Sequence, residues 1–247
     1  MKVFLITVCV FLTYFGSAVK LPSSFIKCDL KQTDFQECLT TAVQNAIRQL
    51  NHAFNEVNLL AIEPLEIPSL SIAAGSRIVF TQQNYKNLKF SGFNETTCSK
   101  VEFDVDTKTL KLDCVVPRFR IEFDYDLHGQ VLLIPLYGKG SGWSIFHDNH
   151  LVLTFKFGEY EKKGKKYYNI IKNELLMQPR EIEIDADNLF DGDEEAAERF
   201  KKILRENILD VYDDVKSGYE EAYGKIFAFI LDGLLMKVPV ADLFGEK

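Results

Sequence analysis

The segment DGDEEAAERFKKILRENILDVYDDVKSGYEEAYGKIFAFILDGLLM, residues 191–236, dominates the architecture that this chain predicts. Its apolar side chains recur every three or four positions, which is the spacing of one face of an α-helix. Asp191, followed three residues later by Glu194, predicts an N-cap with its capping-box partner, and Pro239 marks the end. We therefore expect one helix on the order of 60 Å long. Its apolar face comprises Phe200, Leu204, Ile208, Val211, Val215, Tyr219, Ala222, Ile226 and Ile230.

The second half of this predicted helix cannot stand alone in water. Residues 226–231 are apolar on nearly every side, so another part of the chain must enclose them. Gly218, Gly224 and Gly233 predict bends in the helix. A coiled-coil arm is a poorer interpretation, because the apolar face is broad and aromatic and lacks regular heptad spacing.

The composition indicates a chain that folds around a large apolar core. Its 247 residues are 47% hydrophobic and include 20 Phe and 10 Tyr, and this length is enough for one large domain or two small ones. The formal net charge of −7 argues against nucleic-acid binding. The same charge disfavours docking to anionic membranes.

The first 18 residues predict a secretory signal peptide. Lys2 supplies the positive start, residues 3–12 form the apolar segment, and residues 16–18 form a small-residue cleavage site. The alternative, a membrane anchor, is disfavoured because the apolar run is shorter than the ~20 residues needed to span a bilayer. We expect a single domain over residues 19–247 that is secreted and extracellular, without stable membrane insertion.

In a secreted protein, the cysteines can form disulfides and one asparagine can be glycosylated. Four cysteines follow the predicted signal peptide, and an even number in an oxidising compartment favours disulfides. Cys28 and Cys38 would staple the N-terminal segment to a helix. Cys98 and Cys114 either form a bridge across a hairpin, which requires a bulge, or remain free thiols. Asn94 begins an Asn-Glu-Thr glycosylation acceptor.

The rest of the chain changes from helical to strand periodicity. A helix is predicted to begin at Thr33, with Gln36 completing a capping box. After a proline-containing connector over residues 62–70, the period changes to two between residues 76 and 184. Turn signals within this region fall at residues 106–108, 128–129, 139–142 and 162–164. The pattern predicts an antiparallel meander with one apolar face.

Two features of the predicted sheet indicate strong curvature. Even-numbered residues are apolar before Pro117 and odd-numbered residues after it, which requires a bulge or bend. Several strands are also about twice the typical length of ~5–6 residues. We therefore expect an α+β fold in which a strongly curved antiparallel β-sheet wraps the long C-terminal helix, with a disulfide-stapled helix near the N-terminus.

Chemistry-bearing motifs are scarce. The sequence has no GxSxG elbow, Walker loop or HExxH motif, so we expect no enzyme and no cofactor. His147 and His150 offer two metal ligands but no third, so a polar turn is the better interpretation and no metal site is predicted. The glycines at 138–142 are better explained by a hairpin connection than by a phosphate loop. The functional alternative to a filled core is an apolar cavity, in which Tyr125 or Tyr219 would orient the polar end of a ligand.

Several motifs spread over the chain after residue 18 carry a family resemblance. They are LP at 21–22 with Cys28 and Cys38, IEPL at 62–65, PRFR at 117–120, YDLHG at 125–129, LLIPLYGKG at 132–140 and VPVADLF at 238–244. In this order and spacing the chain resembles the insect takeout proteins, in the superfamily of haemolymph juvenile-hormone-binding proteins. The resemblance implies a hydrophobic tunnel between the long helix and the curved sheet, and an N-terminal disulfide between Cys28 and Cys38. The absence of a cysteine after Cys114 favours the takeout branch over the hormone carriers.

The resemblance and the apolar composition together predict a function. We expect a monomeric, non-enzymatic carrier of a terpenoid-like or long-chain lipophilic ligand, linked by resemblance to circadian, feeding or chemosensory physiology. The alternative is an extracellular interaction protein with a filled core that acts through a receptor or other partner. The residues predicted to line the tunnel are Phe80, Phe103, Phe123, Tyr125, Leu133, Trp143, Phe155, Val215, Tyr219, Ala222 and Ile226.

Overall fold

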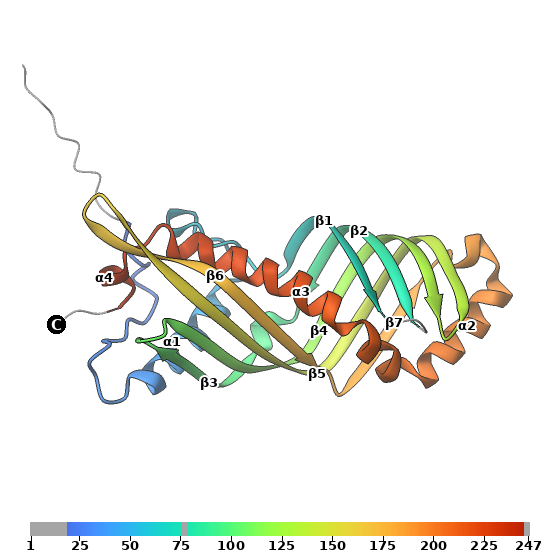
Figure 1. Cartoon of the computed structure of the whole chain (residues 1–247), viewed down its shortest axis with the longest axis horizontal. Helices are drawn as coiled ribbons and strands as arrows, with labels where there is room; N and C mark the ends of the chain where they lie inside the picture. Colours follow the sequence, from blue (N-terminus) through green and yellow to red (C-terminus); the bar gives the residue numbers. More distant parts are fainter. Residues whose placement is uncertain (1–18, 76–78, 245–247) are drawn as a thin grey trace, which may run out of the picture.

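A computed structural model describes residues 19–75 and 79–244 (Figure 1), and the predicted signal peptide lies outside the described residues. The helices are α1 (Phe35–Gln49), α2 (Glu194–Glu206), α3 (Ile208–Leu235) and α4 (Val240–Leu243). The strands are β1 (Leu65–Gly75), β2 (Phe80–Ser91), β3 (Thr97–Asp104), β4 (Thr109–Val131), β5 (Ile134–Lys162), β6 (Lys165–Gln178) and β7 (Glu181–Ala186). Among the described residues, no helix is long and apolar enough to cross a membrane.

The long β4–β5 hairpin is the spine of a single antiparallel sheet. The sheet order is β1-β2-β4-β5-β6, and β3 and β7 join β4 and β5 respectively. The first part of β4 pairs with β3 and the later part with β2, while β5 pairs with β6 in one half and with β7 in the other. The molecule therefore has two halves that share the same two central strands.

The turn of this hairpin lies at Leu132 and Leu133, both with positive φ. The turns predicted at residues 128–129 and 139–142 were wrong, because both segments lie within the paired strands. The turns predicted at 106–108 and 162–164 are present between β3 and β4 and between β5 and β6. Two leucines carry none of the usual turn chemistry, so the sequence pattern missed this turn.

The change of apolar parity at Pro117 marks the boundary between the two halves. Val116 and Phe119 are both buried, so the inward-facing residues do change from even to odd. The β4–β5 register continues unchanged on both sides, from Val116 opposite Asn149 to Arg118 opposite His147. The two strands therefore change parity together, and the intervening residue of β5, Asp148, has φ +43°.

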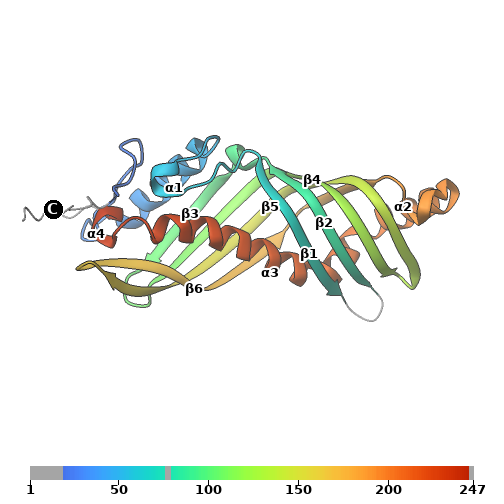
Figure 2. The same ribbon diagram turned by 90° about the horizontal axis from the view of Figure 1, so that it is seen from above.

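Helix α3 closes the open side of the curled sheet. It packs against β1 and β6, the two ends of the main strand order (Figures 1 and 2). Two of the glycines that predicted bends instead allow this close approach. A Cβ on Gly218 would lie 2.5 Å from the Cβ of Ala74, and one on Gly224 would lie 3.3 Å from the Cβ of Leu175. Both glycines lie within the single helix α3.

The predicted single C-terminal helix is broken, which corrects the sequence interpretation. Asn207 separates α2 from α3 with φ −127° and ψ 17°, and its side chain donates to the carbonyl of Ile203 at 2.8 Å. Asparagine competes for backbone hydrogen bonds in this way, so it favours helix ends. The N-cap is Asp193, whose carboxylate accepts from Ala196 N at 3.0 Å, and not Asp191. Helix α2 lies at the opposite end of the molecule from α1 (Figure 1).

Helix α1 protects an edge of the sheet through side-chain hydrogen bonds to the backbone of β3, which the sequence pattern did not predict. It begins at Phe35, and Gln36 does not complete a capping box. The Gln36 side chain instead donates to and accepts from the backbone of Phe103 in β3, at 3.1 and 2.9 Å. One turn later, the Thr40 side chain forms the same pair of hydrogen bonds with the backbone of Val101. Two turns later, the Gln44 side chain donates to the carbonyl of residue 96 and accepts from the N–H of residue 98. These side chains satisfy backbone groups that an edge strand would otherwise leave unpaired.

Both disulfides are formed. Cys28 is bonded to Cys38, and Cys98 to Cys114 across the β3–β4 pair. The β3–β4 register shifts between Cys98 and Lys100, which supplies the bulge that the second bridge requires. The predicted glycosylation acceptor Asn94 is exposed.

Candidate ligand-binding cavities

The concave face of the sheet and helix α3 enclose two apolar cavities among the described residues. The first, here called the large cavity, has a volume of about 320 Å³ and lies in the half of the molecule that contains α1 and β3. The second, the small cavity, has a volume of about 140 Å³ and lies in the half that contains α2, β2 and β7. The interior is therefore not completely filled, whereas the alternative of an interaction protein required a filled core.

The large cavity is lined almost entirely by hydrocarbon. Its walls come from Ala42, Val43 and Ala46 of α1, Leu153 and Phe155 of β5, and Phe227 and Ile230 of α3. Thr96 and Tyr168 are the polar exceptions, and the Thr96 hydroxyl is buried without a hydrogen-bond partner. A ligand in this cavity would be bound mainly by the removal of apolar surface from water, at about 25 cal/mol per Å².

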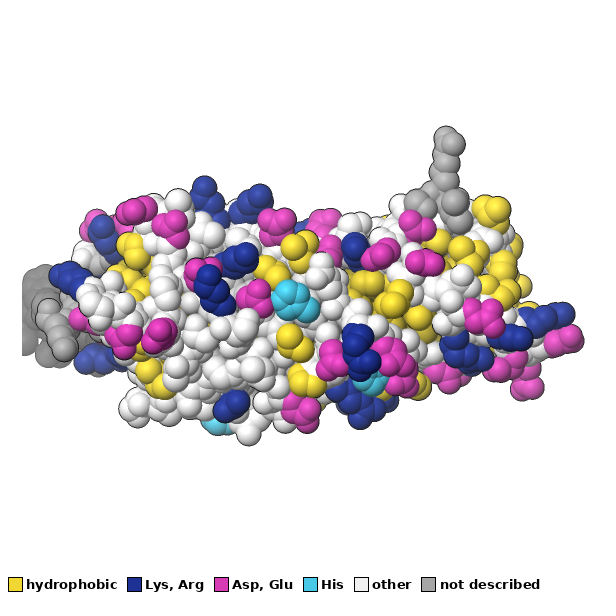
Figure 3. All heavy atoms as spheres, turned by 90° about the horizontal axis from the view of Figure 1, so that it is seen from below, with side chains coloured by type: hydrophobic (Ala, Val, Ile, Leu, Met, Phe, Trp, Pro, Cys, Tyr) yellow, Lys and Arg dark blue, Asp and Glu magenta, His cyan; other side chains and the backbone are white. Residues whose placement is uncertain are grey.

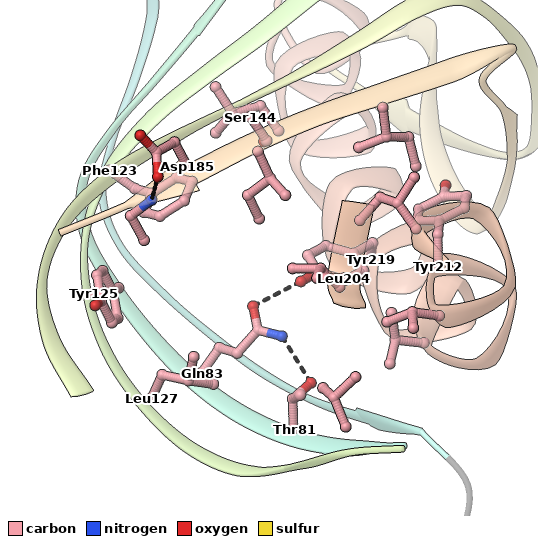
Figure 4. A pocket seen from close by; sticks show the side chains of 18 of the residues that line it. Thr81, Gln83, Phe123, Tyr125, Leu127, Ser144, Asp185, Leu204, Tyr212 and Tyr219 are labelled. Carbon is pink, nitrogen blue, oxygen red and sulfur yellow. Dashed lines mark hydrogen bonds between the residues drawn. The ribbon is translucent and has the colours of Figure 1, made fainter. Parts of the chain in front are cut away.

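The small cavity contains a polar cluster that joins the sheet to α3. The amide oxygen of Gln83, on β2, accepts hydrogen bonds from the hydroxyls of Tyr85 and Tyr219, the latter at 2.7 Å. The Gln83 amide nitrogen donates to the Thr81 hydroxyl at 2.7 Å. Figure 4 shows Gln83 reaching from the sheet towards Tyr219 on the helix, with Thr81 on its other side. Gln83 and Thr81 are both buried, so these groups are shielded from water.

The tyrosines of the small cavity lie in an environment that disfavours charge. Burial raises the pKa of Tyr85, Tyr219 and Tyr223 above the ordinary value. Burial, and then the nearby Asp187 carboxylate, raise the pKa of Tyr125 to about 12. The Tyr125 hydroxyl donates to the backbone carbonyl of Asp187 and so fixes the segment after β7. Each phenol therefore remains neutral at physiological pH.

One ion pair lies on the wall of the small cavity that α2 provides. Lys201 Nζ lies 2.7 Å from the Asp185 carboxylate of β7, and both side chains line the cavity. The Lys201 side chain is 19% exposed and that of Asp185 51%, so the pair lies at the rim.

On the face of the molecule seen from below, hydrophobic side chains gather towards the end that carries α2, among scattered charged groups (Figure 3).

An aromatic cluster separates the two cavities. Phe119 lies at its centre, 1% exposed, with its ring centroid 5.4, 5.2 and 5.9 Å from those of Phe90, Phe93 and Phe146. Tyr223 completes the cluster from α3 at 6.3 Å. Phe93 lines the large cavity, whereas Phe146 and Tyr223 line the small one. We call this cluster the aromatic partition.

The structure places six of the eleven predicted tunnel residues in the cavity walls. Phe123, Tyr125, Val215 and Tyr219 line the small cavity. Phe103 and Phe155 line the large cavity. The expected single tunnel is therefore represented by two cavities that divide these residues between them.

The other five predicted residues line neither cavity. Phe80 is 45% exposed, and Leu133 is 71% exposed at the hairpin turn. Trp143 lies beneath the Arg120 guanidinium, whose central carbon is 5.2 Å from the Trp143 ring centroid, and it lines a polar surface groove. Ala222 and Ile226 line a surface groove between α3 and β1. Ala222 and Ile226 lie in this groove because α3 contacts the sheet on two sides and faces solvent on a third.

The sequence interpretation missed Gln83, Phe119 and the α1 wall of the large cavity. Thr81, Gln83 and Tyr85 alternate with exposed residues along β2, and this alternation was the available signal. In a single sequence, polar residues on the interior face of a strand cannot be distinguished from polar residues on a solvent-exposed face, so the pattern did not assign these residues to the interior.

The metal-ligating side chains of the described residues do not cluster. Across residues 19–75 and 79–244 there is no group of three or more His, Cys, Asp or Glu that could hold a metal. His147 lies 2.5 Å from Glu183, and His150 lies 2.9 Å from Asp113. Each histidine therefore has its own carboxylate partner on the sheet, and neither occupies the predicted turn.

A strongly curled antiparallel sheet closed by a long helix around apolar cavities defines the structural class of this protein. The family model described as haemolymph juvenile hormone binding protein (JHBP) matches residues 4–245. The chain belongs to this family of lipophilic-ligand-binding proteins, which confirms the resemblance inferred from its motifs.

Individual relatives agree with this assignment. The chain is 24% identical over 249 residues to the circadian clock-controlled protein daywake of Drosophila yakuba, covering 92% of this chain and 89% of that protein. It is 23% identical over 237 residues to daywake of Drosophila melanogaster, with the same coverage. The crystal structure of Epiphyas postvittana Takeout 1 matches with a TM-score of 0.77 and 20% identity, over 90% of this chain and 100% of that chain. The predicted fold class is thereby confirmed.

Proposed function

We propose that this protein is a secreted carrier that encloses a lipophilic small molecule, terpenoid-like or a long-chain lipid, in its large cavity. The observation that supports this most strongly is the cavity itself, about 320 Å³ in volume and lined by hydrocarbon from α1, α3 and the sheet. Membership of the haemolymph juvenile hormone binding protein family supports the same class of ligand.

The volume of the large cavity sets how much of a ligand it can enclose. A cavity of about 150 Å³ in another protein holds benzene. On that scale the large cavity accommodates roughly a dozen carbon atoms. Because its lining is almost entirely hydrocarbon, ligands of similar length and different skeleton would bind with similar affinity.

The physiological setting follows from the relatives and the signal sequence. Two similar proteins are named as circadian clock-controlled. The predicted signal peptide and the two disulfides agree with an extracellular carrier. These observations support the proposal that the protein acts in extracellular fluid and in clock-linked physiology, and we propose that it does so as a monomer.

The direct test is to ask whether the purified protein carries a lipid. The secreted protein would be extracted with organic solvent and the extract analysed by mass spectrometry, and the delipidated protein titrated with a fluorescent fatty-acid probe. The proposal predicts a co-purifying lipophile in near-stoichiometric amount and probe binding at micromolar concentration. The absence of both would contradict it.

A further inference from the structure

The small cavity has a chemistry that the proposed carrier function does not use. Its polar cluster consists of Thr81, Gln83 and Tyr85 on β2 and Tyr219 on α3, at the centre of an otherwise largely apolar wall. Among the described side chains that line the large cavity, only Thr96 and Tyr168 are polar. The two cavities therefore favour ligands of different polarity.

Two donor hydrogens of the cluster are not used in hydrogen bonds among the described residues. The oxygen of Gln83 accepts from two phenols, and one of its two amide protons is donated to Thr81. A primary amide has two donor hydrogens and a hydroxyl has one. The second amide proton of Gln83 and the hydroxyl proton of Thr81 therefore have no acceptor among the described residues. The buried hydroxyl of Tyr212, which lines the same cavity, also lacks a partner.

Buried donors without acceptors cost free energy, and a ligand oxygen would remove that cost. We propose that Thr81 and Gln83 form a second binding subsite, which takes a small neutral molecule with an acceptor oxygen, such as a ketone, ester or ether. The cavity volume of about 140 Å³ limits this molecule to the size of one six-membered ring with a substituent.

The electrostatics of the cavity select a neutral ligand over a carboxylate. Lys201, the one cation among the described residues that line this cavity, is already paired with Asp185 at 2.7 Å. The phenols of Tyr85 and Tyr219 are buried, and burial raises the pKa of both. An ionised ligand would lose its hydration here and gain no opposite charge in return.

The aromatic partition makes this subsite independent of the large cavity. Phe119 lines neither cavity and packs on rings that belong to each side. A substitution at Gln83 should therefore change binding in the small cavity and leave the large cavity unaltered. The inference rests on the proposed function only in requiring that small lipophiles reach the interior.

The test compares two probes of the same shape, cyclohexanone and methylenecyclohexane, which differ in the acceptor oxygen. Both would be titrated by NMR into the mature protein and into Gln83→Leu, Thr81→Val and Gln82→Leu. Gln82 is the matched control, because it lies on the same strand and faces outward. Comparing the ratio of the two dissociation constants between each variant and the unmodified protein cancels the different hydration of the free probes.

The subsite predicts that this ratio shifts about tenfold towards the hydrocarbon in Gln83→Leu and in Thr81→Val, which is the effect of one net hydrogen bond. Gln82→Leu should leave the ratio unchanged. An unchanged ratio in the folded Thr81→Val or Gln83→Leu variant, or no binding of either probe to the unmodified protein, would overturn the proposal. Cyclohexanecarboxylate should bind at least tenfold more weakly than cyclohexanone at pH 7, and equal binding would overturn the neutral-ligand assignment.

The fluorescent fatty-acid probe separates this result from the proposed function. Its affinity should be the same in all four proteins, because it reports on the large cavity. If it fails to bind the unmodified protein while cyclohexanone binds, the carrier proposal fails and the subsite stands. If it binds while the ratio is insensitive to Gln83 and Thr81, the carrier proposal stands and the subsite fails.

Discussion

The tyrosines around the small cavity should make the protein sensitive to alkali. The pKa of Tyr125 is raised to about 12, so the folded state holds this phenolic proton more tightly than the unfolded state does. Its contribution to stability is fully present below the ordinary pKa of 10 and is lost as the pH rises towards 12. Burial raises the pKa of Tyr85, Tyr219 and Tyr223 in the same direction.

We therefore expect the free energy of unfolding, measured in urea, to fall between pH 10 and pH 12. Phenolate absorbance in the folded protein at pH 11 should show only the exposed tyrosines ionised, and unfolding should release the rest. Full ionisation of all tyrosines in a folded protein at pH 11 would show that these side chains are not buried as described.

Gly218 tests the close approach of α3 to β1. A Cβ at this position would lie 2.5 Å from the Cβ of Ala74, which forces the helix and the strand apart. Such overpacking costs about 1–3 kcal/mol, against about 1 kcal/mol gained from helix propensity. Gly218→Ala should therefore lower the urea midpoint, whereas Ser217→Ala, on the exposed side of the same turn, should not. A stabilised Gly218→Ala variant would show that α3 lies further from the sheet.

At the scale of single residues, the sequence predicted wall positions where hydrophobicity and burial coincide. Phe123 and Val215 are such positions, and both line the small cavity. Gln83 was missed because a buried polar group depends on its hydrogen-bond partners, and Tyr219 lies 136 positions away in the chain. Trp143 was misplaced because aromatic character alone does not say which face of a two-sided strand it occupies.

At the scale of elements, side chains of α1 take the place of a neighbouring strand at the β3 edge. Gln44 donates to Thr96 O at 2.6 Å and accepts from Cys98 N at 2.7 Å. Gln44→Leu leaves both backbone groups without this partner, and we expect a loss of about 1–3 kcal/mol in the free energy of unfolding. Urea unfolding of Gln44→Leu and of the unmodified protein measures this loss.

The control for Gln44→Leu is Thr41→Ala. Thr41 lies on the exposed side of α1, and within the described part of the chain its hydroxyl donates only to the backbone carbonyl of Glu37 in the same helix, at 3.1 Å. Its substitution should change stability by less than about 0.5 kcal/mol. Equal effects of the two substitutions would mean that the α1–β3 hydrogen bonds do not stabilise the edge.

The elements themselves were predicted from periodicity with characteristic errors. The parity change at Pro117 and the bulge at Cys98 could be predicted because, in a strand with period two, a change of face moves the apolar residues between even and odd positions of the sequence. The break at Asn207 was not visible, because the apolar spacing continues through it and only the local backbone departs from the helix. The turn at Leu133 was missed because no turn-forming residue occupies it.

At the scale of the whole molecule, the aromatic partition limits the length of ligand that the large cavity accepts. Replacing Phe119 with Ala should join the two cavities at a cost of about 3–5 kcal/mol in stability. In displacement of the fluorescent probe, the affinity of hexadecanol relative to decanol should then rise at least tenfold compared with the unmodified protein. Phe119→Leu provides a milder opening if the alanine variant does not fold.

The control for this variant is Phe229→Ala, because Phe229 is 71% exposed and contributes nothing to the partition. Its chain-length preference should match that of the unmodified protein. An unchanged preference in folded Phe119→Ala would mean that the cavities are already continuous for a ligand, or that only one of them is used.

The claim on which the account depends is that a lipophile occupies the large cavity, between α1 and the sheet. The most direct measurement is the affinity of the fluorescent fatty-acid probe for Ala46→Trp, which places an indole in that cavity, and for Ala222→Trp, which places one in the outer groove. We predict at least a tenfold loss of affinity in Ala46→Trp and no change in Ala222→Trp, with both proteins folded. Unchanged affinity in Ala46→Trp, or a loss confined to Ala222→Trp, would contradict the account.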